Sequence, residues 1–135
     1  MSVAQPVVLV VDVANVMGSR PDGWWRDRAG AATRLLGSLS ELAGREVDGP
    51  DGRVALDRVV AVVEGAAKAA TAPDGIEVVR APADGDTAIV DAARDAAASG
   101  SRVLVVTADR GLRARLTDLD ALIAGPGWLN DLLGR

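Results

Sequence analysis

The sequence contains no cysteine and no histidine, and its only lysine is Lys68. The absence of cysteine excludes disulfides and thiolate chemistry, and the absence of histidine excludes imidazole as a base or as a metal ligand. Any catalysis must therefore use carboxylates, hydroxyls, amides, arginine or Lys68. Any metal site must be built from oxygen ligands, which favours Mg²⁺ or Mn²⁺ over zinc.

Long apolar runs are also missing. No run approaches the roughly 18 residues that a membrane helix needs, and residues 1–6 are too short and uncharged for a secretory signal. We therefore expect a cytoplasmic protein with no membrane partner. The formal net charge of −4 argues against a protein that coats nucleic acid electrostatically. It leaves room for an enzyme that binds polyanions locally through metal ions.

The 135 residues fit one domain, residues 1–135, with 49% hydrophobic and 25% charged residues, as is typical of a globular chain. Residues 7–11 are five consecutive aliphatic residues and predict a strand buried on both faces. Residues 44–52 have the composition of a surface loop, residues 66–71 fit a short helix or a loop, and residues 54–61 fit a helix as well as a strand. Further strands are predicted at 58–63, 76–79, 103–107 and 122–124, and helices at 25–43, 86–98, 110–116 and 128–133.

This alternation of strands and helices predicts an α/β fold. Right-handed crossovers give a single doubly wound, Rossmann-like domain with a mostly parallel sheet of about five strands and helices on both faces. If the two halves wind in opposite directions, residues 7–11 and 103–107 become neighbours at the centre. The crevice between these two strands is then the switch point, where such sheets bind ligands.

Acidic residues stand where these central strands end. Asp12 directly follows residues 7–11, Asp109 follows residues 103–107 after one intervening residue, and Asp86 opens the helix before that second strand. We expect the three carboxylates to line one cleft. Without a basic partner they would repel one another and raise their pKa values, unless a divalent cation neutralises them.

Each of these acids also has a purely structural interpretation. Asp12 fits a residue that hydrogen-bonds the loop after its strand, while Asp86 and Asp109 each fit a helix cap, because Asp accepts hydrogen bonds from free first-turn amides. For Asp86 the structural and functional roles are compatible. Asn15, three residues after Asp12, can hydrogen-bond a phosphate without adding charge.

Three short motifs combine these residues, in order along nearly the whole chain. They are Val10-Val11-Asp12-Val13-Ala14-Asn15, Gly85-Asp86-Thr87-Ala88-Ile89-Val90-Asp91 and Val105-Val106-Thr107-Ala108-Asp109-Arg110-Gly111-Leu112. The series resembles the NYN domain of the PIN-like nuclease superfamily, in particular its small stand-alone bacterial members. The resemblance implies a PIN-like fold and a metal-dependent ribonuclease whose carboxylates hold one or two Mg²⁺ or Mn²⁺ ions.

By this resemblance, Asp12, Asp86 and Asp109 match the metal-binding acids, and Asn15 matches the polar residue after the first of them. Asp91 matches a further acid on the helix. Five residues of regular helix turn through about 500°, so Asp91 points about 140° away from Asp86 unless Asp86 is the cap outside the regular turns.

Other side chains near the predicted cleft fit less specific roles. Trp24 fits either a platform for an unpaired base or a core residue under the following helix. Arg20 and Arg110 lie just beyond the two central strands and fit a cationic rim that binds phosphates. Asp84 and Glu64 lie near the same edge, but a turn explains each of them better.

The residues and the resemblance together predict a metal-dependent endoribonuclease with single-stranded RNA as its partner. A homodimer is left open. One alternative is a phosphatase or nucleotide pyrophosphohydrolase acting on small molecules, although the aspartyl-phosphatase pattern requires a second Asp at position 14, which is alanine. The other alternative is a non-catalytic PIN-like module that binds RNA or a protein.

Overall fold

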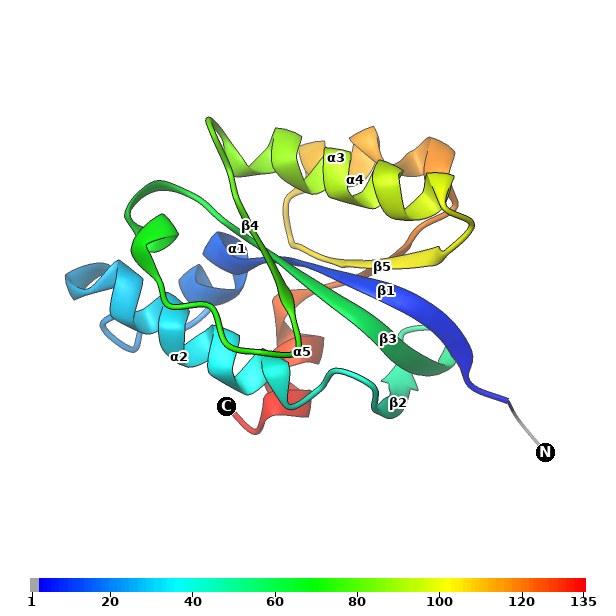
Figure 1. Cartoon of the computed structure of the whole chain (residues 1–135), viewed down its shortest axis with the longest axis horizontal. Coiled ribbons are helices and arrows are strands. Elements are labelled where there is room, and N and C mark those ends of the chain that lie inside the picture. The colour runs from blue at the N-terminus through cyan, green and yellow to red at the C-terminus, as the bar shows by residue number, and fades with distance from the viewer. Residues whose placement is uncertain (1–2) are drawn as a thin grey trace.

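A six-stranded sheet forms the centre of the computed structural model, which describes residues 3–135 (Figure 1). The molecule is a single α/β domain, as the sequence predicts. Its strands are β1 (Gln5–Asp12), β2 (Glu46–Gly49), β3 (Gly52–Val63), β4 (Glu77–Arg80), β5 (Arg102–Val106) and β6 (Leu122–Ala124). Its α-helices are α1 (Val13–Gly18), α2 (Arg28–Ser40), α3 (Gly85–Ala98), α4 (Arg110–Arg115) and α5 (Pro126–Leu133). Three 3₁₀ turns complete the elements: η1 (Trp24–Arg26), η2 (Gly65–Ala69) and η3 (Thr117–Leu119).

β1 is the central strand of this mixed, mostly parallel sheet. It pairs in parallel with β3 on one side and with β5 on the other, in the order β2-β3-β1-β5-β6. The prediction that residues 7–11 and 103–107 lie side by side is therefore confirmed. The other edge of β3 carries two partners, antiparallel β2 near its start and parallel β4 near its end.

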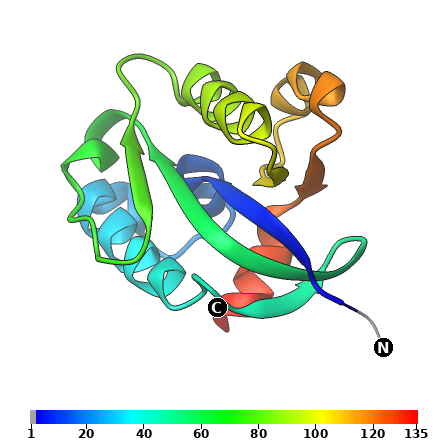
Figure 2. The same cartoon turned by 45° about the vertical axis from the view of Figure 1, so that its right-hand side comes forward.

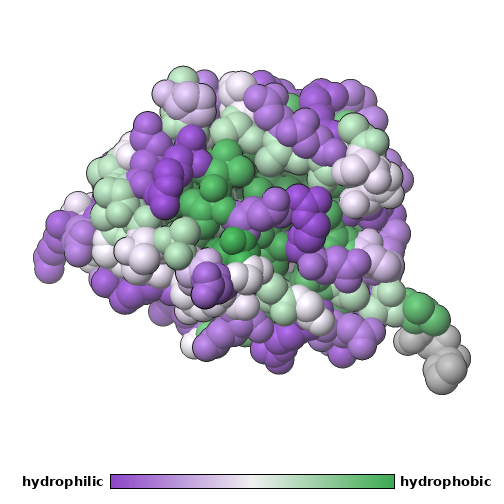
Figure 3. Space-filling view, in the orientation of Figure 1, coloured by the Kyte–Doolittle hydropathy of each residue, from purple (hydrophilic) through white to green (hydrophobic). Residues whose placement is uncertain are grey.

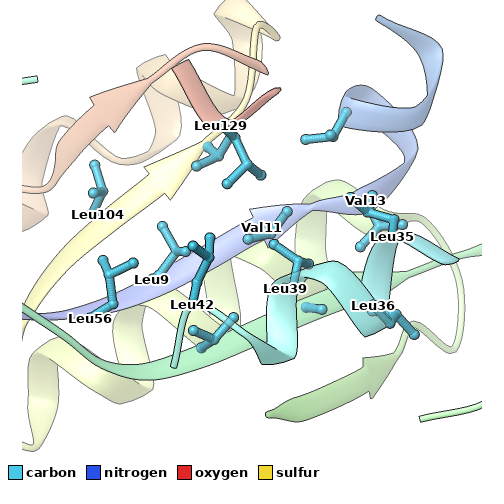
Figure 4. Packing of buried hydrophobic residues seen from close by; sticks show 14 of the residues in the cluster. Leu9, Val11, Val13, Leu35, Leu36, Leu39, Leu42, Leu56, Leu104 and Leu129 are labelled. Atoms are coloured by element: carbon cyan, nitrogen blue, oxygen red, sulfur yellow. The ribbon is translucent and has the colours of Figure 1, made fainter. Parts of the chain in front are cut away.

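The two faces of β1 are buried against different helices, which explains its continuous apolar run. Val7, Leu9 and Val11 belong to one hydrophobic cluster with α1, α2 and α5, whereas Val8 and Val10 belong to a second cluster with α3 and α4. Figures 1 and 2 show these helix layers on opposite sides of the sheet. Figure 4 shows leucines of α2 and α5 packed around Leu9 and Val11.

The hairpin of β2 and β3 corrects two sequence predictions. Residues 44–52 have the composition of a loop, but β2 pairs with the start of β3 and buries Val47. The tip of the hairpin is the turn at residues 50–51, followed by Gly52 with a φ of 114°. Residues 54–61 are strand throughout, so the helical interpretation is wrong, because pairing with β1 and β2 supplies their backbone hydrogen bonds.

Three helices begin at residues other than those predicted, and one of them is α5, which begins at Pro126 rather than at residue 128. α2 begins at Arg28 rather than at residue 25, since Asp27 caps it by accepting a 2.9 Å hydrogen bond from the amide of Gly30. α3 is capped by Asp84, which accepts from the amide of Thr87 at 2.8 Å. Asp86 therefore lies inside the first turn of α3 and is not its cap.

The surface is mixed in character. The face seen in Figure 3 is mostly hydrophilic, with an apolar area near its centre. Among residues 3–135, no helix combines the length and the apolar character that crossing a membrane requires.

Candidate active site

The candidate site lies at the carboxyl end of the parallel strands, where β1, β3 and β5 all terminate. Asp12 is the last residue of β1, Glu64 directly follows β3, and Thr107 directly follows β5. Because these strands are adjacent and parallel, their final residues meet at one edge of the sheet. This edge is the switch point that the sequence predicts.

Asp12 is buried at this edge, with 6% of its surface exposed. One carboxylate oxygen, Oδ1, accepts a 3.2 Å hydrogen bond from the amide of Asn15, and Oδ2 accepts a 3.0 Å hydrogen bond from the hydroxyl of Thr107. Asp12 thereby caps α1, a short helix that the sequence analysis did not predict. Both donors are neutral, so the charge of the carboxylate is oriented without being compensated.

The pKa of Asp12 is raised from its ordinary value of 3.8. Burial is the main cause, and the negative charges of Asp86 and Glu64 add to it, against the opposing effect of the two hydrogen bonds. A carboxylate held in this way is stabilised by any cation that approaches it.

Thr107 and Asn15 connect the loops that follow the two central strands. The hydroxyl of fully buried Thr107 donates to Asp12 and accepts from the amide of Asp109 at 3.1 Å. The side-chain oxygen of Asn15 accepts from the amide of Ala108 at 2.7 Å. Asn15 and Thr107 therefore hold Asp12 and Asp109 in a fixed relation. Sequence reasoning misses the role of Thr107, because a threonine at the end of a buried strand carries no distinctive signal.

Glu64, which the sequence assigns more readily to a turn, belongs to this site. Its Oε2 accepts a 2.6 Å hydrogen bond from the amide of Gly85, and its charge raises the pKa values of Asp12 and Asp86. A Cβ at position 85 would lie 2.7 Å from that oxygen, so glycine lets the Glu64 carboxylate approach this closely without turning aside. A sequence signal is available, since Glu64 follows the buried run 59–63 as Asp12 follows residues 7–11.

Asp86 and Asp109 complete the group. Asp86 lies in the first turn of α3, and its pKa is raised. Partial burial is the main cause, and repulsion from Asp109, Asp84 and Glu64 adds to it. The positive charge of Arg115 lowers the same pKa and offsets part of the increase. Asp109 caps α4 by accepting a 3.0 Å hydrogen bond from the amide of Leu112. Its structural role and its place beside Asp86 are therefore compatible. We call Asp12, Glu64, Asp86 and Asp109 the acidic cluster.

Asp91 does not reach the acidic cluster. Because α3 is regular from Gly85 onward, Asp91 lies about 140° around the helix from Asp86. Its exposed side chain lines a groove on the outer face of α3 with Asp84 and Asp95. The condition under which Asp91 would face the site, with Asp86 as the cap, is not met.

The remaining candidate residues surround this edge. Arg20 follows α1, Arg110 begins α4, and both are exposed. Trp24 lies in η1 and is partly buried; it lines a groove of about 390 Å³ together with Glu64. In the part of the chain that the structure describes, neither arginine forms an ion pair.

The donor set of the acidic cluster suits a hard divalent cation, because it offers carboxylate oxygens whose charges repel one another. The same acids are not arranged as a finished coordination site. Across residues 3–135, no group of three or more His, Cys, Asp or Glu side chains lies in an arrangement that could hold a metal ion. The chemistry of these oxygen donors therefore fits a divalent metal ion, but the side chains are not positioned to coordinate one.

The fold and this edge are consistent with a PIN-like α/β domain. The chain is similar in structure to Rae1 (YacP) from Bacillus subtilis, with a TM-score of 0.68, 19% identity, and coverage of 94% of this chain and 73% of that one. The W164L mutant of Rae1 gives a TM-score of 0.70 at 17% identity, covering 95% of this chain and 75% of that one. No family model matches the sequence, and no curated protein matches it. These similarities establish a shared fold.

Proposed function

We propose that this chain is a metal-dependent endoribonuclease that hydrolyses phosphodiester bonds in single-stranded RNA. The observation that carries the proposal is the acidic cluster, in which four acids, two from strand ends and two from helix starts, repel one another at the switch point of the sheet. The NYN/PIN-like fold and the three sequence motifs support a nuclease-like role. Paired carboxylates at a cleft suit phosphoryl chemistry without histidine.

Asp12, Asp86 and Asp109, with Glu64 beside them, are the residues that would hold Mg²⁺ or Mn²⁺. The bound ion would supply Lewis acidity to the phosphoryl group and lower the pKa of a water nucleophile. Asp12 is the fixed member, because its two hydrogen bonds orient both of its oxygens. Glu64 is held by the Gly85 amide and Asp109 by the Leu112 amide, so Asp86 is the side chain that must turn toward an ion.

The chain also offers groups that would bind the RNA backbone. Arg20 and Arg110 place exposed guanidinium groups beyond the ends of β1 and β5, where they can bind phosphates on either side of the acidic cluster. Asn15 acts in positioning, since its side-chain oxygen is engaged with Ala108 while its amide holds Asp12.

A second candidate function is a non-catalytic RNA-binding module of the same fold. The observation that favours it is the absence, within residues 3–135, of three acids arranged to hold a metal ion. Such a module would keep the cationic rim and would lose turnover.

One experiment separates these functions. The purified protein is incubated with end-labelled single-stranded RNA, with p-nitrophenyl phosphate and with ATP, each with Mn²⁺ and with EDTA. Asp12→Asn is the test variant. The matched control is Asp57→Asn, because Asp57 is an exposed acid within β3 and lies away from the carboxyl end of that strand. We expect RNA cleavage that EDTA and Asp12→Asn abolish and that Asp57→Asn retains.

The other outcomes assign the chain elsewhere. Hydrolysis of p-nitrophenyl phosphate or ATP without RNA cleavage would identify a small-molecule hydrolase. RNA binding without turnover of any substrate would identify the binding module. RNA cleavage that persists in EDTA or in Asp12→Asn would contradict the acidic cluster as the source of activity.

A further inference from the structure

A groove lies directly beside the acidic cluster, on the side of α1 and η1. It has a volume of about 390 Å³, within the range of small-ligand sites. Its walls combine apolar surface with one aromatic ring, one cation and one acid, contributed by Ala14, Met17, Trp24, Arg28, Glu64 and Ala83. We call it the Trp24 groove.

Trp24 and Arg28 form a stacked pair in this groove. The guanidinium carbon of Arg28 lies 5.3 Å from the centre of the Trp24 ring, over the indole. Trp25 contacts Trp24 edge-on, with ring centres 5.9 Å apart and planes at 88°, and so restrains the indole from the side. Unpaired bases stack on aromatic rings and on guanidinium planes, and both groups line this groove.

The charge of Arg28 is available to a ligand. Among the described residues it forms no ion pair, and its side chain is exposed at the start of α2. A guanidinium in this position can stack on a base or bind the phosphate that follows it. The partner that suits an aromatic ring, a cation and an apolar wall together is a nucleotide.

Glu64 joins the Trp24 groove to the acidic cluster. Its side chain lines the groove, while its carboxylate contacts Gly85 and raises the pKa values of Asp12 and Asp86. Ala14 of the groove also lies between Asp12 and Asn15 in sequence. A nucleic acid strand with a phosphate at the cluster therefore has its neighbouring nucleotide at the mouth of the groove.

We infer that the Trp24 groove binds one unpaired base of single-stranded RNA, adjacent to the phosphate at the acidic cluster. This inference rests on the proposed function, and it adds a base-binding subsite and the residues that form it. A duplex cannot use the groove, because its bases are stacked on one another and are not free to enter. The groove would therefore make the protein selective for single strands.

The test measures binding of 5′-fluorescein-labelled octauridylate in the Asp12→Asn background, where cleavage is absent. A series of octamers carries a single abasic nucleotide at each successive position. We expect one or two adjacent positions at which the abasic nucleotide weakens binding by about tenfold, the effect of losing one base stack. In Asp12→Asn with Trp24→Leu, the same abasic octamers and the intact octamer should bind equally.

A second variant guards against misfolding, because Trp24 packs partly against the core. Circular dichroism checks the fold of Trp24→Leu, and Arg28→Gln, at an exposed position, should also reduce the abasic effect. Arg45→Gln changes an exposed arginine outside the groove and is the matched control, which should keep the full effect.

The outcomes for groove and chemistry are distinct. Three results would contradict base binding in the Trp24 groove. They are an abasic series in which no position weakens binding, an abasic effect that is equal with and without Trp24→Leu, and no binding of the octamer. RNA cleavage by the wild type with a flat abasic scan leaves the proposed activity standing and removes only the groove. A Trp24-dependent abasic effect without cleavage by the wild type keeps the groove and removes the proposed activity.

Discussion

Acidic side chains at the carboxyl end of the sheet differ from those on the rest of the surface. On the rest of the surface, five acids lie within ion-pair distance of an arginine, whereas no member of the acidic cluster does so within residues 3–135. The five pairs are Asp22–Arg135, Asp48–Arg53, Glu77–Arg58, Asp118–Arg94 and Asp120–Arg102. The chain therefore pairs its acids with arginine in several places and leaves the cluster to neutral donors.

A shortage of arginine does not explain this difference. α4 begins beside the cluster and carries Arg110, Arg113 and Arg115. Arg113 donates instead to the backbone carbonyl of Thr107, and Arg115 only partly offsets the charges around Asp86. Buried, mutually repelling carboxylates are typical of sites that bind a cation or do chemistry. Stability alone would favour pairing or removing these charges.

The substitution with the largest expected effect is Asp12→Asn, which removes one carboxylate from the acidic cluster. If the acidic cluster is catalytic, RNA cleavage should fall by about a thousandfold, since several kcal/mol of transition-state stabilisation depend on a complete set of metal ligands. The same substitution should raise the melting temperature at pH 7, because it removes a carboxylate whose ionisation burial disfavours. Cleavage rates and thermal melts measure the two effects.

The pH dependence of that stabilisation has a defined sign. The raised pKa of Asp12 means that its contribution to stability is present below 3.8 and is lost as pH rises through the folded-state pKa. Wild type and Asp12→Asn should therefore melt at similar temperatures near pH 4, with the variant increasingly more stable toward pH 7. If Asp12→Asn were less stable than the wild type at neutral pH, the conclusion that the charge of Asp12 is uncompensated would be wrong.

Thr107→Val tests how neutral donors hold the cluster. The substitution keeps the shape and removes a fully buried hydroxyl that donates to Asp12 and accepts from Asp109. We expect a loss of about 1–3 kcal/mol in the free energy of unfolding, because the buried carboxylate of Asp12 and the partly buried amide of Asp109 each lose a partner. Denaturant unfolding measures the loss, and Thr107→Ser should retain most of the stability.

Gly85→Ala tests the contact between Glu64 and the start of α3. A methyl group at position 85 would meet the Glu64 carboxylate at 2.7 Å, so the acid must move away or the helix must shift. Because the Glu64 carboxylate ends a flexible side chain and can turn aside, we expect a loss of only about 0.5–1.5 kcal/mol in the free energy of unfolding, which is the net contribution of its hydrogen bond to the Gly85 amide. In the Glu64→Ala background the same change should become neutral or stabilising, because alanine is the better helix former. Equal effects in both backgrounds would show that the contact has no energetic weight.

The central part of the fold was predictable because it depends on buried runs and their order. The apolar runs at 7–11 and 103–107 are buried on both faces and form the paired strands β1 and β5. β2 was not predictable, since its four residues depend on pairing with distant β3 and not on their own composition. α1 was missed because it follows Asp12 without a turn signal.

The candidate site was predictable to the extent that it depends on strand ends. Asp12 and Asp109 were found because each follows an apolar run, and the same rule applied to residues 58–63 would have found Glu64. The start of α3 was misplaced because two acids, Asp84 and Asp86, each fit a cap. Only the hydrogen bond from Thr87 to Asp84 decides between them, and it also determines where Asp91 points.

A bound divalent cation should compensate the charges of the acidic cluster, as arginines compensate the paired acids on the surface. If Mn²⁺ binds the acidic cluster, it should raise the melting temperature at pH 7 by a few degrees, corresponding to about 1.4 kcal/mol at ten times Kd. Asp12→Asn and Asp86→Asn should each reduce the shift, while Asp57→Asn should not. A calorimetric or fluorescence melt with Mn²⁺ and with EDTA makes the measurement. No shift in the wild type would count against the metal site.

Arg94→Ala removes one of the five surface ion pairs, and we expect it to have the smallest effect on stability. Arg94 donates to both carboxylate oxygens of Asp118, at 3.0 and 3.3 Å, and lowers the pKa of Asp118 below 3.8. The resulting stability is present above pH 3.8 and is lost as pH falls through the lowered pKa. Because both side chains are about half exposed or more, we expect only a small loss of stability at pH 7, weakened further by salt. A loss in denaturant unfolding as large as that of Thr107→Val would show that paired surface acids matter as much to stability as the acids buried at the sheet edge.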